Sequence, residues 1–211
     1  MRRGLFITFE GTEGSGKSLQ ARMLVAHLQS QQVPVLATHE PGGTPLGDQI
    51  RQLVLLRDDL SVGARTEALL MCSSRAQLVD TVIRPALDRG EVVVCDRFAD
   101  STLVYQGAGR GLDMQALASV ISFATAGLQP DMTILLDLPV EVGLARKHSQ
   151  QAGWNRFEDE ALAFHSRVRE GYHTLARTEP ARWHCFDGLR PADSLSEEIW
   201  RVIAARLGLT S

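Results

Sequence analysis

The sequence predicts an α/β fold: a doubly wound, parallel, five-stranded sheet covered by helices on both faces. Five short apolar runs occur along the chain, and stretches with helical periodicity separate them. Strands that are apolar on both faces and alternate with helices are typical of a parallel sheet buried between helical layers. No repeat of roughly 20 to 50 residues is present, which excludes a solenoid. The length of 211 residues fits one domain over residues 1–211.

The expected strands are 5–9, 33–37, 92–95, 132–136 and 183–186. Apolar residues at helical spacing follow the first strand (Ala21, Leu24, Val25, Leu28) and precede the last (Phe157, Ala161, Phe164, Val168, Leu175). Gly90 is expected to end the helix before the third strand. Ser194 and Glu197 have the spacing of a capping box that opens the final helix.

Composition and charge exclude several classes of protein. The net charge is −3, and 20 of the 22 basic residues are arginines, with Lys17 and Lys147 the two lysines. No polybasic arm for nucleic acid or anionic lipid is present, so a phosphate ligand is expected to be held locally by a shaped site. Three cysteines far apart in the sequence give no support for a disulfide framework or a zinc site.

The N-terminal region carries no targeting signal that we can identify. Arg2 and Arg3 precede the apolar run 5–9, but Glu10 interrupts this run before it reaches the length of a signal-peptide core. No stretch approaches the ~18 apolar residues of a membrane span. We therefore expect a cytoplasmic protein with no membrane and no nucleic-acid partner.

The strongest local signal is a complete phosphate-binding loop. It follows the pattern G-x-x-x-x-G-K-[ST] between an expected strand and an expected helix, and consists of Gly11, Thr12, Glu13, Gly14, Ser15, Gly16, Lys17 and Ser18. Glycines let backbone N–H groups turn toward phosphate oxygens, and the helix N-terminus adds a positive dipole end. Lys17 is expected to bridge the β- and γ-phosphates, and the Ser18 hydroxyl to hold Mg²⁺.

A carboxylate for the metal is expected from Asp96, which follows the apolar run Val92–Cys95. In a parallel sheet, the ends of neighbouring strands meet at the edge that carries the phosphate loop. The sequence excludes a classical GTPase, because the motif that recognises guanine, Asn-Lys-x-Asp, needs a lysine and neither lysine of this chain fits it. Lys17 lies in the phosphate loop, and His148 and Ser149 follow Lys147.

Further segments carry a specific resemblance. Phe9–Ser18 is followed by Glu40-Pro41-Gly42-Gly43-Thr44, by Ser74-Arg75-Ala76-Gln77, by Asp96-Arg97-Phe98 continuing to Gln106, and later by Leu136–Leu144 and Arg156-Phe157-Glu158. Together these motifs, in this order, resemble the bacterial thymidylate kinases (dTMP kinases) of the P-loop nucleoside monophosphate kinase family. The resemblance covers most of the chain.

The resemblance implies strand order 2-3-1-4-5, ATP and Mg²⁺ as cofactors, phosphorylation of dTMP to dTDP as a step of dTTP synthesis, and a homodimer. It implies that Arg97 clamps the acceptor phosphate, which suits its planar guanidinium fork. It places Glu10 near the acceptor 3′-hydroxyl and the metal, and Arg75 on a thymine carbonyl. The remaining substrate-binding positions are Glu40, Pro41, Met71, Phe98, Ser101, Thr102, Tyr105 and Gln106.

Two departures from the family pattern bear on function. His39 stands where the loop before Glu40 usually has arginine, and Met71 where an aromatic residue usually stacks on thymine. Family members whose phosphate loop has no arginine carry an arginine-rich lid over the transferred phosphoryl group. This phosphate loop has none, so the resemblance implies that a cation of the lid, about residues 146–156, acts on that group. Arg156 and Arg146 are favoured over Lys147, and Arg146 stacking on adenine is the other interpretation.

Two alternative functions stay open at this point. The first is a related nucleotide kinase with a different or broader monophosphate acceptor, which Met71 leaves open. The second is a regulatory module that binds ATP through the phosphate loop without transferring phosphate.

Overall fold

The computed structural model describes residues 3–56, 60–149, 157 and 160–209. Its centre is a parallel sheet of five strands: β1 Phe6–Glu10, β2 Val35–His39, β3 Val92–Asp96, β4 Met132–Asp137 and β5 Trp183–Asp187. The strands lie in the order β2-β3-β1-β4-β5. All four pairings are parallel. The expected fold class, strand positions and strand order are therefore confirmed.

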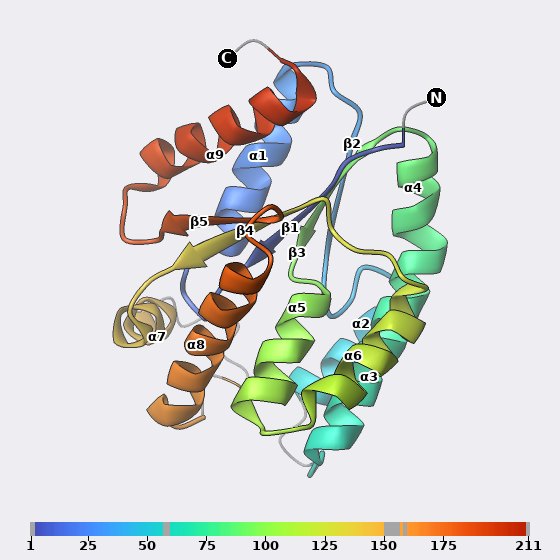
Figure 1. Ribbon diagram of the computed structural model, residues 1–211, viewed down its shortest axis with the longest axis vertical. Helices are drawn as coiled ribbons and strands as arrows, with labels where there is room; N and C mark the ends of the chain where they lie inside the picture. Colours follow the sequence, from blue (N-terminus) through green and yellow to red (C-terminus); the bar gives the residue numbers. More distant parts are fainter. Residues whose placement is uncertain (1–2, 57–59, 150–156, 158–159, 210–211) are drawn as a thin grey trace.

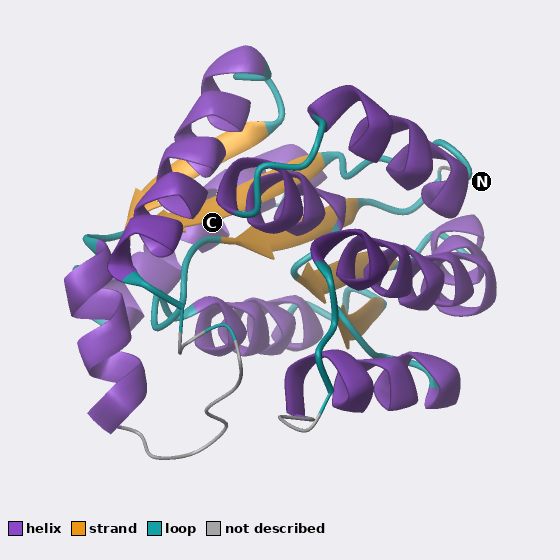
Figure 2. Cartoon of the chain, turned by 90° about the horizontal axis from the view of Figure 1, so that it is seen from below, coloured by secondary structure: helices purple, strands orange, loops and turns teal. Residues whose placement is uncertain are grey.

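Helices surround the sheet (Figures 1 and 2). They are α1 Lys17–Ser30, α2 Pro45–Arg51, α3 Ala64–Leu78, α4 Arg84–Asp88, α5 Ala99–Thr102, α6 Met114–Thr125, α7 Val140–Ser149, α8 Leu162–Thr178 and α9 Ala192–Leu207. Segments Gln52–Leu56, Val79–Ile83 and Leu103–Gly109 are π-helical. None of the described helices is both long and apolar enough to cross a membrane.

Side chains alternate between the two faces of the sheet, and each face has its own core. Ile7 and Phe9 of β1 belong to the core formed with α1 and α9, which Figure 1 shows on one side of the sheet. Phe6 of the same strand belongs to the core on the opposite face, with residues from α3 and α4. Because both faces are buried, the strands read as continuous apolar runs in the sequence.

The loops that follow the strands are tied together at the carboxyl edge of the sheet. The Glu40 N–H, after β2, donates to the Asp96 carbonyl at 2.9 Å, and the Arg97 N–H, after β3, donates to the Phe9 carbonyl of β1 at 2.9 Å. The Gly188 N–H, after β5, donates to the Asp137 carbonyl of β4 at 2.7 Å. These bonds bring the sequence motifs to one edge.

One helix start differs from the sequence-based expectation. Gly90 does follow the end of α4 with a positive φ of 82°, as expected. The last helix, however, begins at Ala192 with Pro191 at its N-cap, so the expected capping box at Ser194 is wrong. Ser194 lies inside the first turn, where its hydroxyl donates to the Pro191 carbonyl at 3.0 Å.

Helix α7 packs directly on the phosphate loop, backbone against backbone. A Cβ added at Gly143 would lie 2.3 Å from the Glu13 carbonyl oxygen, and one added at Gly14 would lie 2.0 Å from the Gly143 carbonyl oxygen. Only glycine at both positions permits this approach.

We predict that Gly143→Ala lowers the free energy of unfolding by about 1–3 kcal/mol, because the added methyl group overpacks this contact. The measurement is urea unfolding. Gly63→Ala is the matched control, since a Cβ at Gly63 would meet no atom within 4 Å. Equal effects of the two changes would contradict the close packing of α7.

Candidate active site

The phosphate loop joins β1 to α1 and presents backbone N–H groups to a cavity of about 800 Å³. We call this the phosphate cavity. Its lining includes Gly14, Gly16, Lys17 and Ser18. Gly14 and Gly16 have positive φ angles of 67° and 94°, which glycine adopts without strain and which let the loop curl. The loop and the α1 N-terminus together form an anion-binding cradle.

Lys17 is held across its own loop. Its Nζ donates to the Thr12 carbonyl at 2.7 Å and to Ser15 Oγ at 3.2 Å. Burial and the nearby Arg97 guanidinium lower the Lys17 pKa to about 8, although Asp96 and Glu13 oppose this shift. An anion entering the cavity would therefore find two cations that repel each other.

Ser18 and Asp96 meet in the phosphate cavity, as expected from the sequence. The Ser18 hydroxyl donates to the Asp96 carboxylate, and both residues line the cavity. A hydroxyl next to a carboxylate fits Mg²⁺, which binds few protein oxygens and keeps water or phosphate oxygens as its other ligands. Within the described part of the chain, no group of three or more His, Cys, Asp or Glu residues is arranged to hold a metal.

Arg97 adopts a left-handed backbone conformation, with φ 69°. This conformation is unfavourable by on the order of 1–2 kcal/mol for a residue with a Cβ. Its guanidinium donates to Tyr105 at 3.0 Å, to Glu13 at 3.2 Å, and to Ser101 and Tyr172 at 3.2 Å each. Arg97 lines the phosphate cavity and also a second cavity beside it.

Glu10 lies beneath this turn and not in a cavity. It is fully buried and accepts hydrogen bonds from the Phe98 N–H at 2.8 Å, from Ser101 at 2.7 Å and from Tyr172 at 2.8 Å. It lines neither cavity. The predicted contacts of Glu10 with a metal and an acceptor hydroxyl stay a prediction. Its carboxylate is engaged in holding the backbone after Arg97.

Glu13 is a site residue whose role the sequence did not reveal, since it stands at a variable position of the loop pattern. It lines both cavities. Its Oε1 accepts from Tyr105 at 2.6 Å, and its Oε2 lies 3.3 Å from Nδ1 of the fully buried His165. Burial raises the Glu13 pKa, but contacts with His165, Arg97 and Lys17 outweigh it and lower the pKa to about 2. The carboxylate is therefore ionised.

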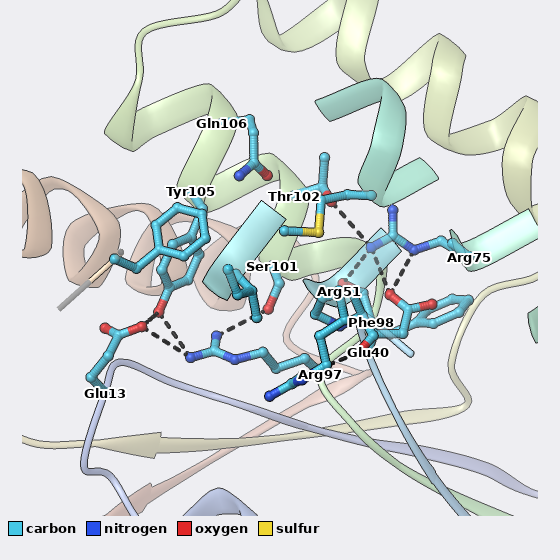
Figure 3. Close-up of a pocket in the computed structure, with 14 residues that line it drawn as sticks. Glu13, Glu40, Arg51, Arg75, Arg97, Phe98, Ser101, Thr102, Tyr105 and Gln106 are labelled. Atoms are coloured by element: carbon cyan, nitrogen blue, oxygen red, sulfur yellow. Dashed lines mark hydrogen bonds and ion pairs between the residues drawn. The ribbon is translucent and has the colours of Figure 1, made fainter. Parts of the chain in front are cut away.

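The second cavity, which we call the base cavity, gathers the substrate-binding residues expected from the sequence (Figure 3). They are Glu40, Pro41, Met71, Arg75, Arg97, Phe98, Ser101, Thr102, Tyr105 and Gln106. Of the substrate positions expected from the sequence, only Glu10 lies outside it. The sequence reasoning missed Arg51, Leu55 and Phe157, which also line it.

Arg75 is fixed in the base cavity by buried partners. Its Nε and Nη2 donate to Glu40 Oε2 at 2.9 and 2.7 Å, and Nη2 also contacts the Phe98 carbonyl and Thr102 at 3.1 Å each. The ion pair holds the guanidinium in one orientation, so its free edge is preorganised for a ligand acceptor.

Arg51 links the two cavities. It lies at the end of α2, lines both, and donates from Nη1 to the Pro41 carbonyl at 3.0 Å. Nothing in the local sequence pattern distinguishes it from a surface arginine of an amphipathic helix.

The expected lid is described only in part. Arg146 lies on α7 and donates to the Gly188 carbonyl at 2.8 Å. Lys147, the next residue, lines the phosphate cavity. Arg156 lies outside the described residues, so its expected role stays a prediction.

Glu10 gives the fold a dependence on pH. Burial and the nearby Asp100 raise its pKa to about 7, and Arg97 and the hydrogen bonds from Ser101 and Tyr172 oppose this. A raised carboxyl pKa means that the folded state binds more protons than the unfolded state between pH 4.5 and about 7.

We therefore predict that the contribution of Glu10 to stability is lost as pH rises through about 7, by about 3 kcal/mol in total. Urea unfolding at pH 5 to 8 measures it, with Glu10→Gln flattening this part of the profile. The exposed Glu197→Gln serves as control. A Glu10→Gln profile parallel to that of the unmodified protein would contradict the prediction.

Known proteins resemble this chain in sequence and in fold. The family model described as thymidylate kinase matches residues 9–199. A thymidylate kinase of Thermomicrobium roseum is 50% identical over 198 residues, covering 94% of this chain and 93% of the relative. One from Deinococcus radiodurans is 48% identical over 206 residues, covering 98% and 99%.

A solved structure agrees with the fold. The crystal structure of thymidylate kinase from Ehrlichia chaffeensis superposes with a TM-score of 0.77 at 29% identity, and covers 95% of this chain and 98% of that one. The family match spans the phosphate loop, both cavities and the loops that join them. The chain belongs to the thymidylate kinase family.

Proposed function

We propose that this thymidylate kinase family member transfers the γ-phosphoryl group of ATP to dTMP, with ATP phosphates in the phosphate cavity and the dTMP base in the base cavity. The observation that carries this proposal is the position of Arg97, which lines both cavities and lies close enough to Lys17 to lower its pKa. A phosphate between the two cavities would meet both cations. This is the point at which donor and acceptor phosphates must approach.

The chemistry needs positioning and neutralisation of charge more than a general base. The second pKa of a phosphate is about 6, so the attacking oxygen of dTMP is already ionised at neutral pH. In this proposal Arg97 and Arg51 hold the acceptor phosphate, and Lys17 with the loop N–H groups holds the donor; the lining of the phosphate cavity by all three side chains supports these roles. Phosphoryl transfer draws most of its rate enhancement from such placement.

Ser18 and Asp96 would hold Mg²⁺ in this arrangement. When bound, the ion neutralises charge on the β- and γ-phosphate oxygens. The contact between the two side chains supports this assignment, because it places both oxygens on one side of the phosphate cavity.

We infer that residues 146–156 act as a lid of the single domain and that they supply a further cation. Lys147 already lines the phosphate cavity. Arg146 is held by the Gly188 carbonyl, in the loop after β5. This favours a role for Arg146 beside the nucleotide base of ATP over direct contact with the transferred phosphoryl group, which leaves that contact to Arg156 or Lys147.

The proposed reaction is tested by a coupled assay of ADP release with dTMP, dUMP, dCMP, dGMP and UMP in parallel. We expect ADP release that depends on added monophosphate, is fastest with dTMP and is abolished by EDTA. ADP release independent of any monophosphate would instead indicate an ATPase module. Faster turnover of another monophosphate would indicate the broader or different acceptor that Met71 leaves open.

Two variants separate the roles of the two cavities. We predict that Arg97→Ala raises the KM for dTMP at least about tenfold and lowers kcat about a hundredfold, since it removes a charged clamp, while the KM for ATP changes little. Lys17→Ala is expected to abolish transfer with little change in dTMP binding. Steady-state kinetics with each substrate varied measures both. Equal loss of ATP binding in the two variants would contradict the division of the cavities.

We further propose that the protein is a homodimer through α3 and α6, which pack against each other and carry exposed apolar side chains. Phe123 of α6 is 89% exposed and Leu69 of α3 is 55% exposed. Apolar side chains of this size at such exposure mark an interaction surface when they cluster.

Sedimentation velocity tests the dimer. We expect Phe123→Asp to convert a dimer into a monomer, because it places a charge in the apolar interface. Leu162→Asp is the control, since Leu162 is also an exposed apolar residue, 46% exposed, but lies on α8. A monomeric unmodified protein, or identical behaviour of the two variants, would reject this surface.

A further inference from the structure

Glu67 is a fully buried carboxylate that lies behind the base cavity without lining it. It belongs to the first turn of α3. Its Oε1 accepts from Gln106 Nε2 at 2.8 Å and from Arg110 Nε at 3.2 Å, and its Oε2 accepts from Arg110 Nη2 at 3.2 Å. Arg110 therefore balances the charge of Glu67, and Gln106 takes one of its remaining acceptor sites.

The contact with Glu67 determines the direction of the Gln106 amide. An ionised carboxylate only accepts hydrogen bonds, whereas a glutamine amide has a donor end and an acceptor end. The NH₂ of Gln106 must therefore face Glu67, and its Oε1 must face away. Gln106 lines the base cavity, and Figure 3 shows its amide end directed into it beside Tyr105 and Thr102. Within the described residues nothing donates to Oε1, so this oxygen is available to a ligand donor.

Arg75 presents the opposite polarity to the same cavity. A guanidinium only donates, and Glu40, the Phe98 carbonyl and Thr102 occupy its Nε and Nη2. Its Nη1 has a long contact of 3.7 Å with the Cys72 sulfur. On the base cavity, Arg75 thus contributes a donor and Gln106 an acceptor.

The complement of this pair is a base edge with an N–H next to a carbonyl. Thymine and uracil carry such an edge at N3 and O4, whereas cytosine has an acceptor at N3 and an amino group at position 4. A base that places a donor opposite a donor, or an acceptor opposite an acceptor, leaves buried polar groups unpaired. The site discriminates strongly against such a base.

We propose that Glu67 is a positioning residue for base selectivity, which acts by fixing the Gln106 amide with its oxygen toward the base. This inference rests on the proposed location of dTMP in the base cavity. Arg75 alone would distinguish one base from another only by the substituent at position 4. By orienting Gln106, Glu67 adds discrimination between bases that carry a proton at N3 and bases that do not.

Glu67→Gln is the direct test, because an amide at position 67 can either accept from Gln106 or donate to it. The Gln106 amide is then free to lie in both orientations. We expect kcat/KM for dTMP to fall only about twofold, whereas kcat/KM for 5-methyl-dCMP rises at least about tenfold, the size of one buried hydrogen bond regained. 5-Methyl-dCMP is the appropriate probe because it differs from dTMP only at N3 and position 4.

Glu160→Gln is the matched control. Glu160 accepts from Arg110 Nη1 at 2.5 Å, so the change neutralises a carboxylate on the same arginine without touching Gln106. We expect it to leave the selectivity ratio unchanged. In a Gln106→Met background, which has no amide to orient, Glu67→Gln should also leave the ratio unchanged.

Equal loss of activity toward both substrates in Glu67→Gln would show a merely structural role and overturn the proposal, as would an unchanged ratio in a folded variant. If the variant does not fold, a crystal structure of the unmodified protein with dTMP decides. N3 of thymine must then lie within hydrogen-bond distance of the Gln106 amide atom that is farther from Glu67. Failure of the unmodified protein to phosphorylate dTMP would instead reject the proposed function.

Discussion

The site depends on a buried carboxylate that holds an unfavourable backbone turn. Glu10 accepts the Phe98 N–H and so holds the chain where Arg97 takes a left-handed conformation. Without that bond, the strain at Arg97 would relax toward an ordinary extended backbone. Since the guanidinium of Arg97 contacts Glu13 and Tyr105 and lines both cavities, the placement of the residue shared by the two cavities depends on this interaction beneath it.

Two ion pairs balance charge in the site, and they differ in burial and in role. The pair of Arg75 with Glu40 is buried and fixes a guanidinium that lines the base cavity. The contact of Arg97 with Glu13 is more exposed, and both residues line the two cavities. In the proposed reaction, a phosphate that binds Arg97 would displace this contact or share it. An incoming polyanion therefore meets cations that are already positioned, which reduces the reorganisation needed for transfer.

Much of the fold follows from the sequence, because apolar runs and helical periodicity report burial directly. All five strands lie within two residues of their expected positions, and the strand order implied by the family resemblance is the one observed. The start of α9 was missed because Ser194 and Glu197 satisfy the capping pattern locally, while the chain path after β5 begins the helix earlier. Local patterns cannot report such a tertiary constraint.

The site was predictable where a residue type is tied to a motif, and less so where its role depends on its neighbours. The phosphate loop, Asp96 and the base-cavity residues come together as expected. The sequence could not show that Glu10 faces the interior or that Glu13 lines both cavities, because the direction of a side chain at or after the end of a strand depends on the turn that follows. Arg51 and Glu67 likewise gain their significance only from what lies beside them.

The contact between Gly143 and the phosphate loop involves backbone atoms on both sides. Side chains can rotate to absorb a movement, but two peptide groups at this distance cannot. Any shift of the loop as it closes on a nucleotide must therefore displace α7, the helix from which the expected lid departs. Nucleotide binding at the loop and the position of the helix that leads into the expected lid are in this way mechanically linked, as long as positions 14 and 143 are glycine.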